Sequence, residues 1–287
     1  MMNMRYFIKA ALILRKTVWF IVRSLLTTAV VMGLIFTYAY KLEPAWTEVR
    51  EQKVYLEGLP EAFEGFRIVQ ISDLHGRHFP DKKLVRQVNR LEPDIIAITG
   101  DVLDDDPEVP LEYLESALGG ISARYGSFFV FGNNDSYPGK ELVSRRLEEL
   151  GIKVLINGNR PISLEGGNLW LAGVDDPRDG KPFLSRALEG VGEGPVILLA
   201  HSPEIIDSAA DAGFDLVLVG HTHGGQILLP KVPRVITFVR KGYERYVSGL
   251  YTVGNTQMYV TRGLGMTKIP MRFWARPEIS VITLYPK

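Results

Sequence analysis

The 287-residue chain contains no cysteine. It can therefore form no disulfide and no thiolate zinc site, and cysteine usage says nothing about its redox compartment. It also has no internal repeat and no low-complexity tract. Its 46% hydrophobic and 23% charged residues are typical of one sizeable globular domain with a short extension. A disordered chain is not expected.

Acidic residues are absent from the first 41 positions, which hold six basic ones, Arg5, Lys9, Arg15, Lys16, Arg23 and Lys41. Because the chain has 33 residues of each sign, positions 42–287 hold 27 basic and 33 acidic residues, a net charge near −6. Nucleic-acid binding draws most of its free energy from Lys and Arg side chains that neutralise phosphates. We therefore expect no nucleic-acid partner, and no motif indicates a protein partner.

One long hydrophobic run is present, the seventeen uncharged residues from Ser24 to Tyr40. As a helix it spans roughly 25 Å, close to the about 30 Å of a membrane's hydrocarbon core, and Arg23 can snorkel to the surface. Five of the six basic residues precede the run, so the positive-inside rule places the N-terminus in the cytoplasm. We predict a single-pass cell-membrane protein with 1–45 as a basic tail and signal anchor, 46–60 as a linker, and 61–287 as an extracytoplasmic domain.

Two other interpretations of this segment remain. A cleaved signal peptide shares the basic and apolar regions, but residues 37–43 offer no clear small-x-small cleavage site. A buried core helix would need a partner for Arg23 and fits poorly with the purely basic flank.

Short apolar runs alternate with amphipathic segments, 82–91 and 142–150 among them, through the rest of the chain. This alternation is typical of a layered α/β architecture in which helices cover a sheet. The predicted strands are 66–72, 95–99, 127–131, 170–174, 196–200 and 216–219, followed by 251–253, 258–261 and 280–284.

Side chains that bind metals follow five of these runs directly. Side chains at the carboxyl ends of adjacent strands converge on one place, so separation in the sequence does not prevent a single site. Asp, Asn and His are the ligands that hold two divalent cations over a phosphate. The residues are Asp73 and His75, Asp101, Asn133 in Gly-Asn-Asn-Asp, His201, and His221 and His223 in Gly-His-Thr-His.

The ordered series, with Ser-Asp-Leu-His-Gly at 72–76 and Arg-Gly-Leu-Gly at 262–265, resembles the calcineurin-like metallophosphoesterase superfamily, in particular its membrane-anchored bacterial phosphodiesterase-like branch. The resemblance covers nearly all of 67–284. It implies a four-layer αββα sandwich with two mixed β-sheets, and two divalent ions, of manganese, iron, zinc or magnesium. It also implies the ligands: Asp73, His75 and His223 for one ion, Asn133, His201 and His221 for the other, and Asp101 as the bridge.

The same resemblance implies hydrolysis of a phosphodiester or pyrophosphate by a hydroxide that bridges the metals. The substrate would be a phosphorylated small molecule or a lipid, such as a UDP-sugar lipid. Asn134 departs from the family pattern, because many members carry a histidine there and an amide cannot supply a proton. We expect Asn134 to support the transition state and Asp135 to orient a neighbouring ligand. A phosphomonoesterase and a non-catalytic scaffold are the alternatives.

Other polar residues have a structural interpretation beside a functional one. His78 is expected on the surface, with substrate contact as the alternative, and 104–106 is expected to be a solvated loop. Asp175 and Asp176 are expected to serve a turn. Segments 228–251 and 266–276 mix basic and apolar residues, which suits either ordinary strands or an anionic lipid surface.

Overall fold

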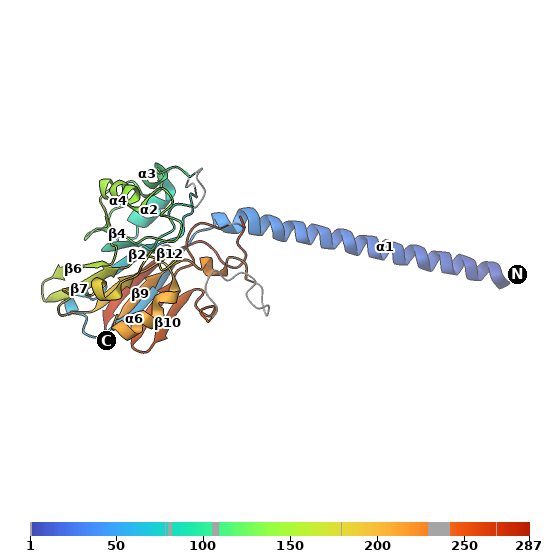
Figure 1. Cartoon of the computed structure of the whole chain (residues 1–287). Helices are drawn as coiled ribbons and strands as arrows, with labels where there is room; N and C mark the ends of the chain where they lie inside the picture. Colours follow the sequence, from blue (N-terminus) through green and yellow to red (C-terminus); the bar gives the residue numbers. More distant parts are fainter. Residues whose placement is uncertain are drawn as a thin grey trace.

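A computed structural model describes residues 2–77, 79, 82–104, 109–178, 180–228, 242–267 and 269–287. A long N-terminal helix, α1 (Met2–Thr37), projects from a layered α/β domain (Figure 1). A π-helical turn (Tyr38–Leu42) and a 3₁₀ turn (Glu43–Ala45) continue α1 into the domain.

Two six-stranded sheets form the centre of the domain. The first has the order β1-β12-β2-β3-β4-β5, in which β12 runs parallel to β1 and antiparallel to β2, and β2 to β5 are parallel. Its strands are β1 (Glu48–Leu56), β2 (Arg67–Ile71), β3 (Ile95–Ile98), β4 (Ser127–Phe129), β5 (Ile152–Val154) and β12 (Glu278–Pro286).

The second sheet has the order β10-β11-β9-β8-β7-β6, with a parallel centre from β11 to β7 and antiparallel pairs at both edges. Its strands are β6 (Gly158–Leu164), β7 (Gly167–Gly173), β8 (Val196–Leu199), β9 (Leu216–Val219), β10 (Gly249–Val253) and β11 (Thr256–Val260).

Side chains that alternate along each strand build three hydrophobic layers. In β2, Ile68 faces the core between the sheets, whereas Val69 and Ile71 face the outer core of the first sheet. That outer core is completed by α2 (Lys83–Asn89), α3 (Tyr113–Leu118) and α4 (Lys140–Glu149). On the second sheet, α5 (Leu184–Ala187) and α6 (Ile206–Ala212) cover the outer face. The predicted αββα sandwich with two mixed sheets is therefore confirmed.

Residues 46–60 are not a simple linker. They contain β1, which pairs in register with β12 from Glu48↔Glu278 to Leu56↔Pro286. Because β1 lies at the edge of the sheet, only its Val54 and Leu56 side chains are fully buried, and the rest of the strand is largely polar. The sheet thus begins well before residue 61.

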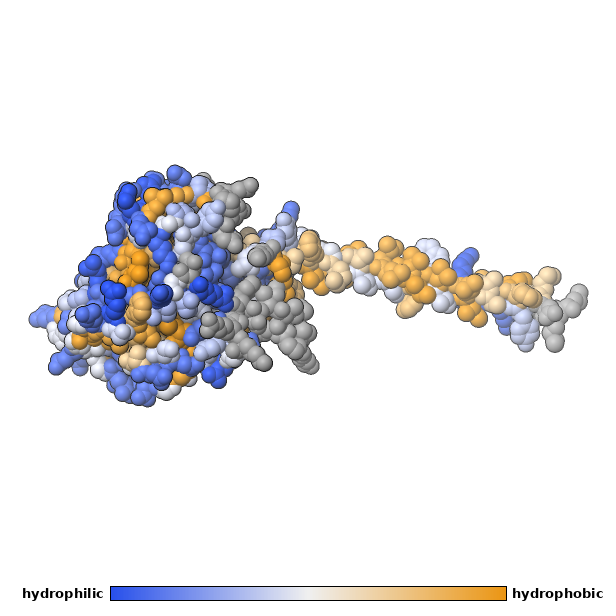
Figure 2. Space-filling view, viewed as in Figure 1, coloured by the Kyte–Doolittle hydropathy of each residue, from blue (hydrophilic) through white to orange (hydrophobic). Residues whose placement is uncertain are grey.

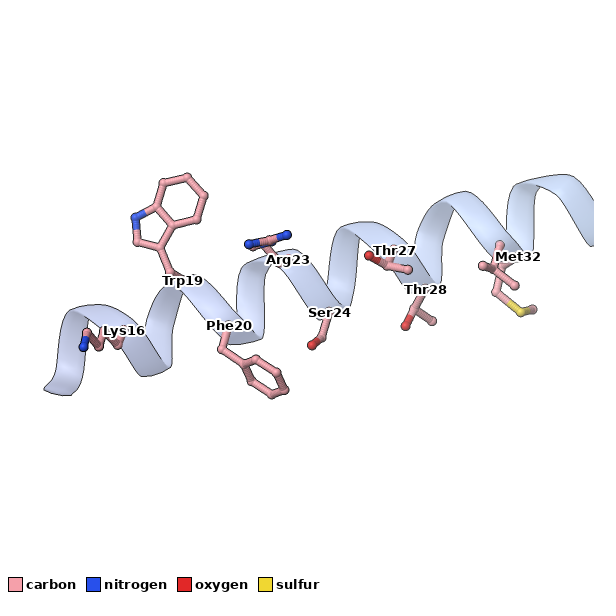
Figure 3. A pocket seen from close by; sticks show the side chains of 9 residues that line it. Lys16, Trp19, Phe20, Arg23, Ser24, Thr27, Thr28 and Met32 are labelled. Atoms are coloured by element: carbon pink, nitrogen blue, oxygen red, sulfur yellow. The ribbon is translucent and has the colours of Figure 1, made fainter.

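Helix α1 is long and apolar enough to cross a membrane, and its most apolar stretch is not buried against the domain. Figure 2 shows hydrophobic side chains along its exposed length. A buried core helix is therefore wrong. The concavity in Figure 3 is a groove on this single helix, lined by Lys16, Trp19, Phe20, Arg23, Ser24, Thr27, Thr28, Val31 and Met32.

Candidate metal centre

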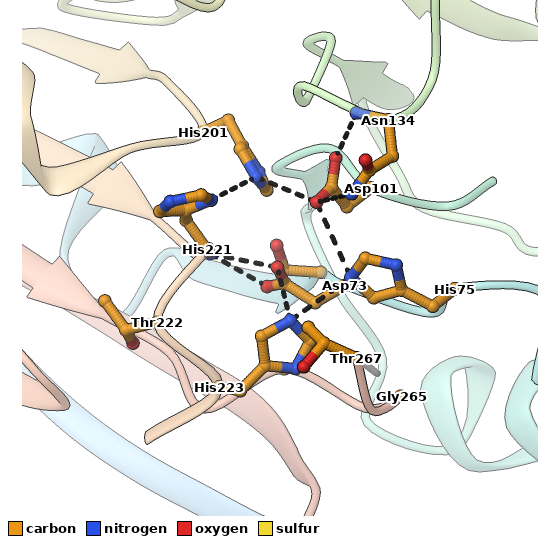
Figure 4. A network of polar contacts seen from close by, with 12 residues as sticks. Asp73, His75, Asp101, Asn134, His201, His221, Thr222, His223, Gly265 and Thr267 are labelled. Atoms are coloured by element: carbon orange, nitrogen blue, oxygen red, sulfur yellow. Dashed lines mark hydrogen bonds and ion pairs between the residues drawn. The ribbon is translucent and has the colours of Figure 1, made fainter. Parts of the chain in front are cut away.

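The loops that follow β2, β3, β4, β8 and β9 bring the predicted ligands together from both sheets (Figure 4). One group consists of Asp73, His75 and His223, whose candidate ligand atoms lie within 4.8 Å of one another. The other consists of Asp101, His201 and His221, within the same limit.

Asp101 belongs to the second group and also contacts the first. Its Oδ2 atom is 3.2 Å from His201 Nε2 and 3.5 Å from His75 Nε2. The side chain is almost fully buried. One carboxylate thus contacts an imidazole from each group, which is the position that a bridging ligand requires.

The imidazole rings each present one nitrogen to the centre. His75 Nε2 is 3.1 Å from His223 Nε2, and His221 Nδ1 is 3.0 Å from His201 Nε2. The opposite nitrogen of His201, Nδ1, lies 2.8 Å from the carbonyl oxygen of Thr99, an acceptor that fixes the N–H on Nδ1. The Nε2 atom of His201 is therefore left to face Asp101.

Asp104 supports His75 in a similar way. Its Oδ2 atom lies 3.4 Å from His75 Nδ1, on the side of the ring away from the centre. We predict a solvated loop at 104–106, and Asp104 contacts His75 from it. Residues 105 and 106 lie outside the described residues, as does His78.

Asn133 and Asn134 differ in what they contact. Asn133 Oδ1 is buried and has no hydrogen-bond partner among the described residues, which is costly for an acceptor unless a cation or water satisfies it. Asn134 donates from its backbone N–H to Asp101 Oδ1 (2.9 Å) and from Nδ2 to Asp101 Oδ2 (2.8 Å). Asn134 therefore holds the carboxylate that lies between the groups.

Asp135 fastens two of the loops to each other. Its Oδ2 accepts from the N–H groups of Asp101 (2.7 Å) and Gly132 (2.8 Å), and its Oδ1 from those of Val102 (2.8 Å) and Leu103 (2.9 Å). Burial and the Asp101 carboxylate raise the pKa of Asp135 to about 6, although the backbone donors oppose the shift. Asp135 therefore holds the backbone of the loop that carries Asp101 in place.

The electrostatics of these side chains fit a pair of cations. Burial opposes ionisation of both Asp101 and His201, yet their mutual attraction prevails, so the pKa of Asp101 is lowered and that of His201 is raised well above its usual value. Burial and neighbouring His75 lower the pKa of His223 far below its usual value. Close-packed imidazole nitrogens and buried carboxylates are a donor set that divalent cations satisfy.

The backbone at the centre is strained. Ten described non-glycine residues have positive φ, and five of them are the predicted ligands Asp73, His75, Asp101, His221 and His223. Such conformations cost about 1–3 kcal/mol each and persist only where the surroundings enforce them. Glycine permits the close approach of the loops, because a Cβ at Gly132 would lie 2.2 Å from Asp101 Oδ1.

Asp176 serves a turn, as predicted, because its Oδ1 accepts from the N–H of Arg178 at 2.8 Å. Asp175 pairs with Lys140 Nζ at 2.7 Å. A role for either residue toward substrate stays a prediction.

A two-sheet α/β fold with paired Asp and His clusters at its strand ends defines a metallophosphoesterase. The family model described as Calcineurin-like phosphoesterase matches residues 66–225, more than half of the 287 residues, and the chain belongs to this family. It is therefore a metal-dependent phosphoric ester hydrolase.

Similar proteins include two bacterial ones of comparable length. The Bacillus subtilis (strain 168) protein named "Uncharacterized metallophosphoesterase YkuE" is 35% identical over 270 residues, which cover 91% of this chain and 93% of the relative. The Escherichia coli (strain K12) protein named "Phosphodiesterase YaeI" is 30% identical over 263 residues, covering 87% and 92%. The Danio rerio "Transmembrane protein with metallophosphoesterase domain" is 35% identical over 257 residues, covering 83% of this chain and 57% of the relative.

Proposed function

We propose that the chain is a membrane-anchored phosphodiesterase that uses two divalent cations. Its substrate would carry a phosphodiester or pyrophosphate bond on a lipid or envelope-linked molecule, of which a UDP-sugar lipid is one example. The observation that carries this proposal is that Asp101 contacts imidazoles of both groups of candidate metal ligands. The basic residues that precede the apolar helix support an extracytoplasmic domain.

We assign one ion to Asp73, His75 and His223 and the other to Asn133, His201 and His221, with Asp101 shared. When bound, the cations supply Lewis acidity toward the phosphoryl oxygens and lower the pKa of a coordinated water. The donor set of carboxylate, amide and imidazole suits manganese, iron, zinc or magnesium.

The residues around the ligands maintain this geometry. Asn134 orients the Asp101 carboxylate through two hydrogen bonds, and Asp135 fixes the loop that bears it. Among the described residues at the centre, no imidazole occupies the position where many family members have a general acid. We therefore expect a diester with a good leaving group to react faster than one with a poor leaving group.

The test uses the full chain in detergent micelles with added Mn²⁺. We expect hydrolysis of bis(p-nitrophenyl) phosphate to exceed that of p-nitrophenyl phosphate, and Asp101→Ala to abolish both activities. Asp211→Ala, at an exposed position in α6, is the matched control and should retain the wild-type rate. Equal rates for wild type and Asp101→Ala would reject the proposal, and absence of bound metal by elemental analysis would favour a scaffold.

A further inference from the structure

Large apolar side chains remain exposed where α1 enters the domain. Tyr40, Leu42, Trp46, Ile269 and Trp274 are between 39% and 58% exposed. We call these five residues the collar. They come from two segments, one directly after α1 and one more than 200 residues later in the sequence.

Hydrogen bonds hold the two collar segments together. The N–H of Arg272 donates to the carbonyl of Ala39 (2.9 Å), and the N–H of Ala275 donates to Glu43 Oε1 (2.6 Å). Ala39 and Glu43 are buried although both immediately follow the exposed helix. The end of the anchor is therefore docked on the domain.

Aromatic contacts reinforce this junction. The rings of Tyr38 and Phe273 meet edge to face with centroids 6.1 Å apart. The guanidinium of Arg276 lies 3.7 Å from the centroid of the Trp46 ring. The collar therefore presents a fixed surface of aromatic and aliphatic side chains, with a cation beside it.

The length of the apolar helix places the collar at a membrane surface. A hydrocarbon core of about 30 Å takes roughly 20 helical residues, so a span that ends at Tyr38 begins near Val18, and Arg23 near that end snorkels to the surface. Lys16 and Trp19 lie at that other end. Tyr and Trp are enriched where a span meets water, and here they occur at both ends of the span.

We propose that the collar inserts into the headgroup region of the bilayer that α1 crosses. The collar is connected to the metal centre, because Gln226 Nε2 donates to the carbonyl of Ile269 and Arg272 Nη1 donates to the carbonyl of His223 (3.2 Å). Insertion would hold the metal-centre loops beside the lipid phosphates. This inference rests on the proposed function. With the metal-centre loops in that place, the substrate class is a phosphate ester of a membrane lipid.

The four tryptophans allow a direct test. Full-length variants that each keep one tryptophan, with the other three changed to Phe, are reconstituted in phosphatidylcholine and phosphatidylglycerol vesicles that contain brominated lipids. We expect at least twofold stronger quenching for Trp46 and Trp274 than for Trp170. Trp170 lies on β7, on the side of the domain opposite to α1 (Figure 1). Trp19, within the helix, is the positive control.

A second measurement does not depend on replacing tryptophans. Because the chain has no cysteine, Ile269→Cys introduces a unique site for a polarity-sensitive fluorophore. We expect a blue shift on reconstitution, and none for the same probe at Ser163→Cys on the exposed part of β6.

Quenching of Trp19 without quenching of Trp46 and Trp274, together with no shift at position 269, would overturn the collar proposal. Neither measurement depends on catalysis. The collar can therefore fail while bis(p-nitrophenyl) phosphate is still hydrolysed, and loss of hydrolysis alone would reject the proposed function instead.

Discussion

Arg272 donates a hydrogen bond from Nη1 to the backbone carbonyl of His223, at a distance of 3.2 Å. Its guanidinium is fully buried and also donates to four other backbone carbonyls, those of Arg262, Gly263, Gly265 and Ala275. The loop that carries a predicted metal ligand is thus held by a residue whose backbone N–H donates to Ala39, directly after α1.

Arg272→Met should therefore destabilise the domain and weaken metal binding. Removing a buried charged donor leaves five carbonyls without it, which costs on the order of 3–5 kcal/mol. Thermal unfolding and Mn²⁺ titration by calorimetry measure the two effects. Arg276→Met, at the next arginine along the chain, is the control and should unfold within about 1 kcal/mol of wild type. A stable Arg272→Met protein with wild-type metal affinity would contradict the positioning role.

The stability of forms that lack α1 should depend on the residue at which they begin. A form that begins at residue 38 keeps the contacts of Ala39, Glu43 and Pro44, whose carbonyl accepts from Arg77. A form that begins at residue 46 loses three hydrogen bonds, each worth about 1 kcal/mol. We expect its melting temperature to be lower by roughly 5–10 °C. Equal melting temperatures measured by circular dichroism would show that the docking contributes no stability.

Substitutions of Asn134 should separate two effects on the reaction: the support that its side chain gives to Asp101, and the lack of a proton donor at this position. Asn134→Ala removes the 2.8 Å bond to Asp101 Oδ2 but keeps the backbone bond to Oδ1. The loss of one hydrogen bond to a charged group predicts a rate lower by about 10- to 100-fold.

Asn134→His instead introduces a proton donor. We expect it to raise the rate for a phosphodiester with an alkyl leaving group, relative to bis(p-nitrophenyl) phosphate, by at least about tenfold. Steady-state rates on both substrates give this ratio. An unchanged ratio would mean that the imidazole at 134 does not reach the leaving group.

Metal removal should lower stability in the wild type but not in a variant that lacks the shared ligand. A ligand present at 100 times its Kd stabilises the fold by about 2.7 kcal/mol, so chelation should lower the melting temperature by several degrees. Asp101→Ala should show almost no shift with chelator, whereas Asp211→Ala should behave as the wild type. A chelator effect of equal size in Asp101→Ala would place the stabilising metal elsewhere.

The strands that lead to the metal centre could be predicted because they are parallel and buried on both faces. Runs such as Val196–Leu199 and Leu216–Val219 are uniformly apolar for that reason, and each ends at a polar ligand. Their order in the chain was enough to infer one convergent site.

Other parts could not be predicted for equally physical reasons. Strand β1 reads Glu-Val-Arg-Glu-Gln-Lys-Val-Tyr-Leu and resembles a charged linker, because an edge strand that is half exposed carries little apolar signal. Arg272 resembles a surface residue in sequence, since nothing local indicates that five carbonyls surround it. Asp104 is likewise indistinguishable in sequence from its acidic neighbours, although its side chain contacts His75.

The place of β12 between β1 and β2 has a consequence for biogenesis. Strand β1 emerges from the ribosome first among the described strands, yet its partner β12 emerges after all the others. Synthesis runs at about 5–20 residues per second, so β1 must wait unpaired, attached to α1, until translation has passed β12. An exposed strand edge invites pairing with other chains, and the acidic and basic side chains of β1 would protect it during that interval.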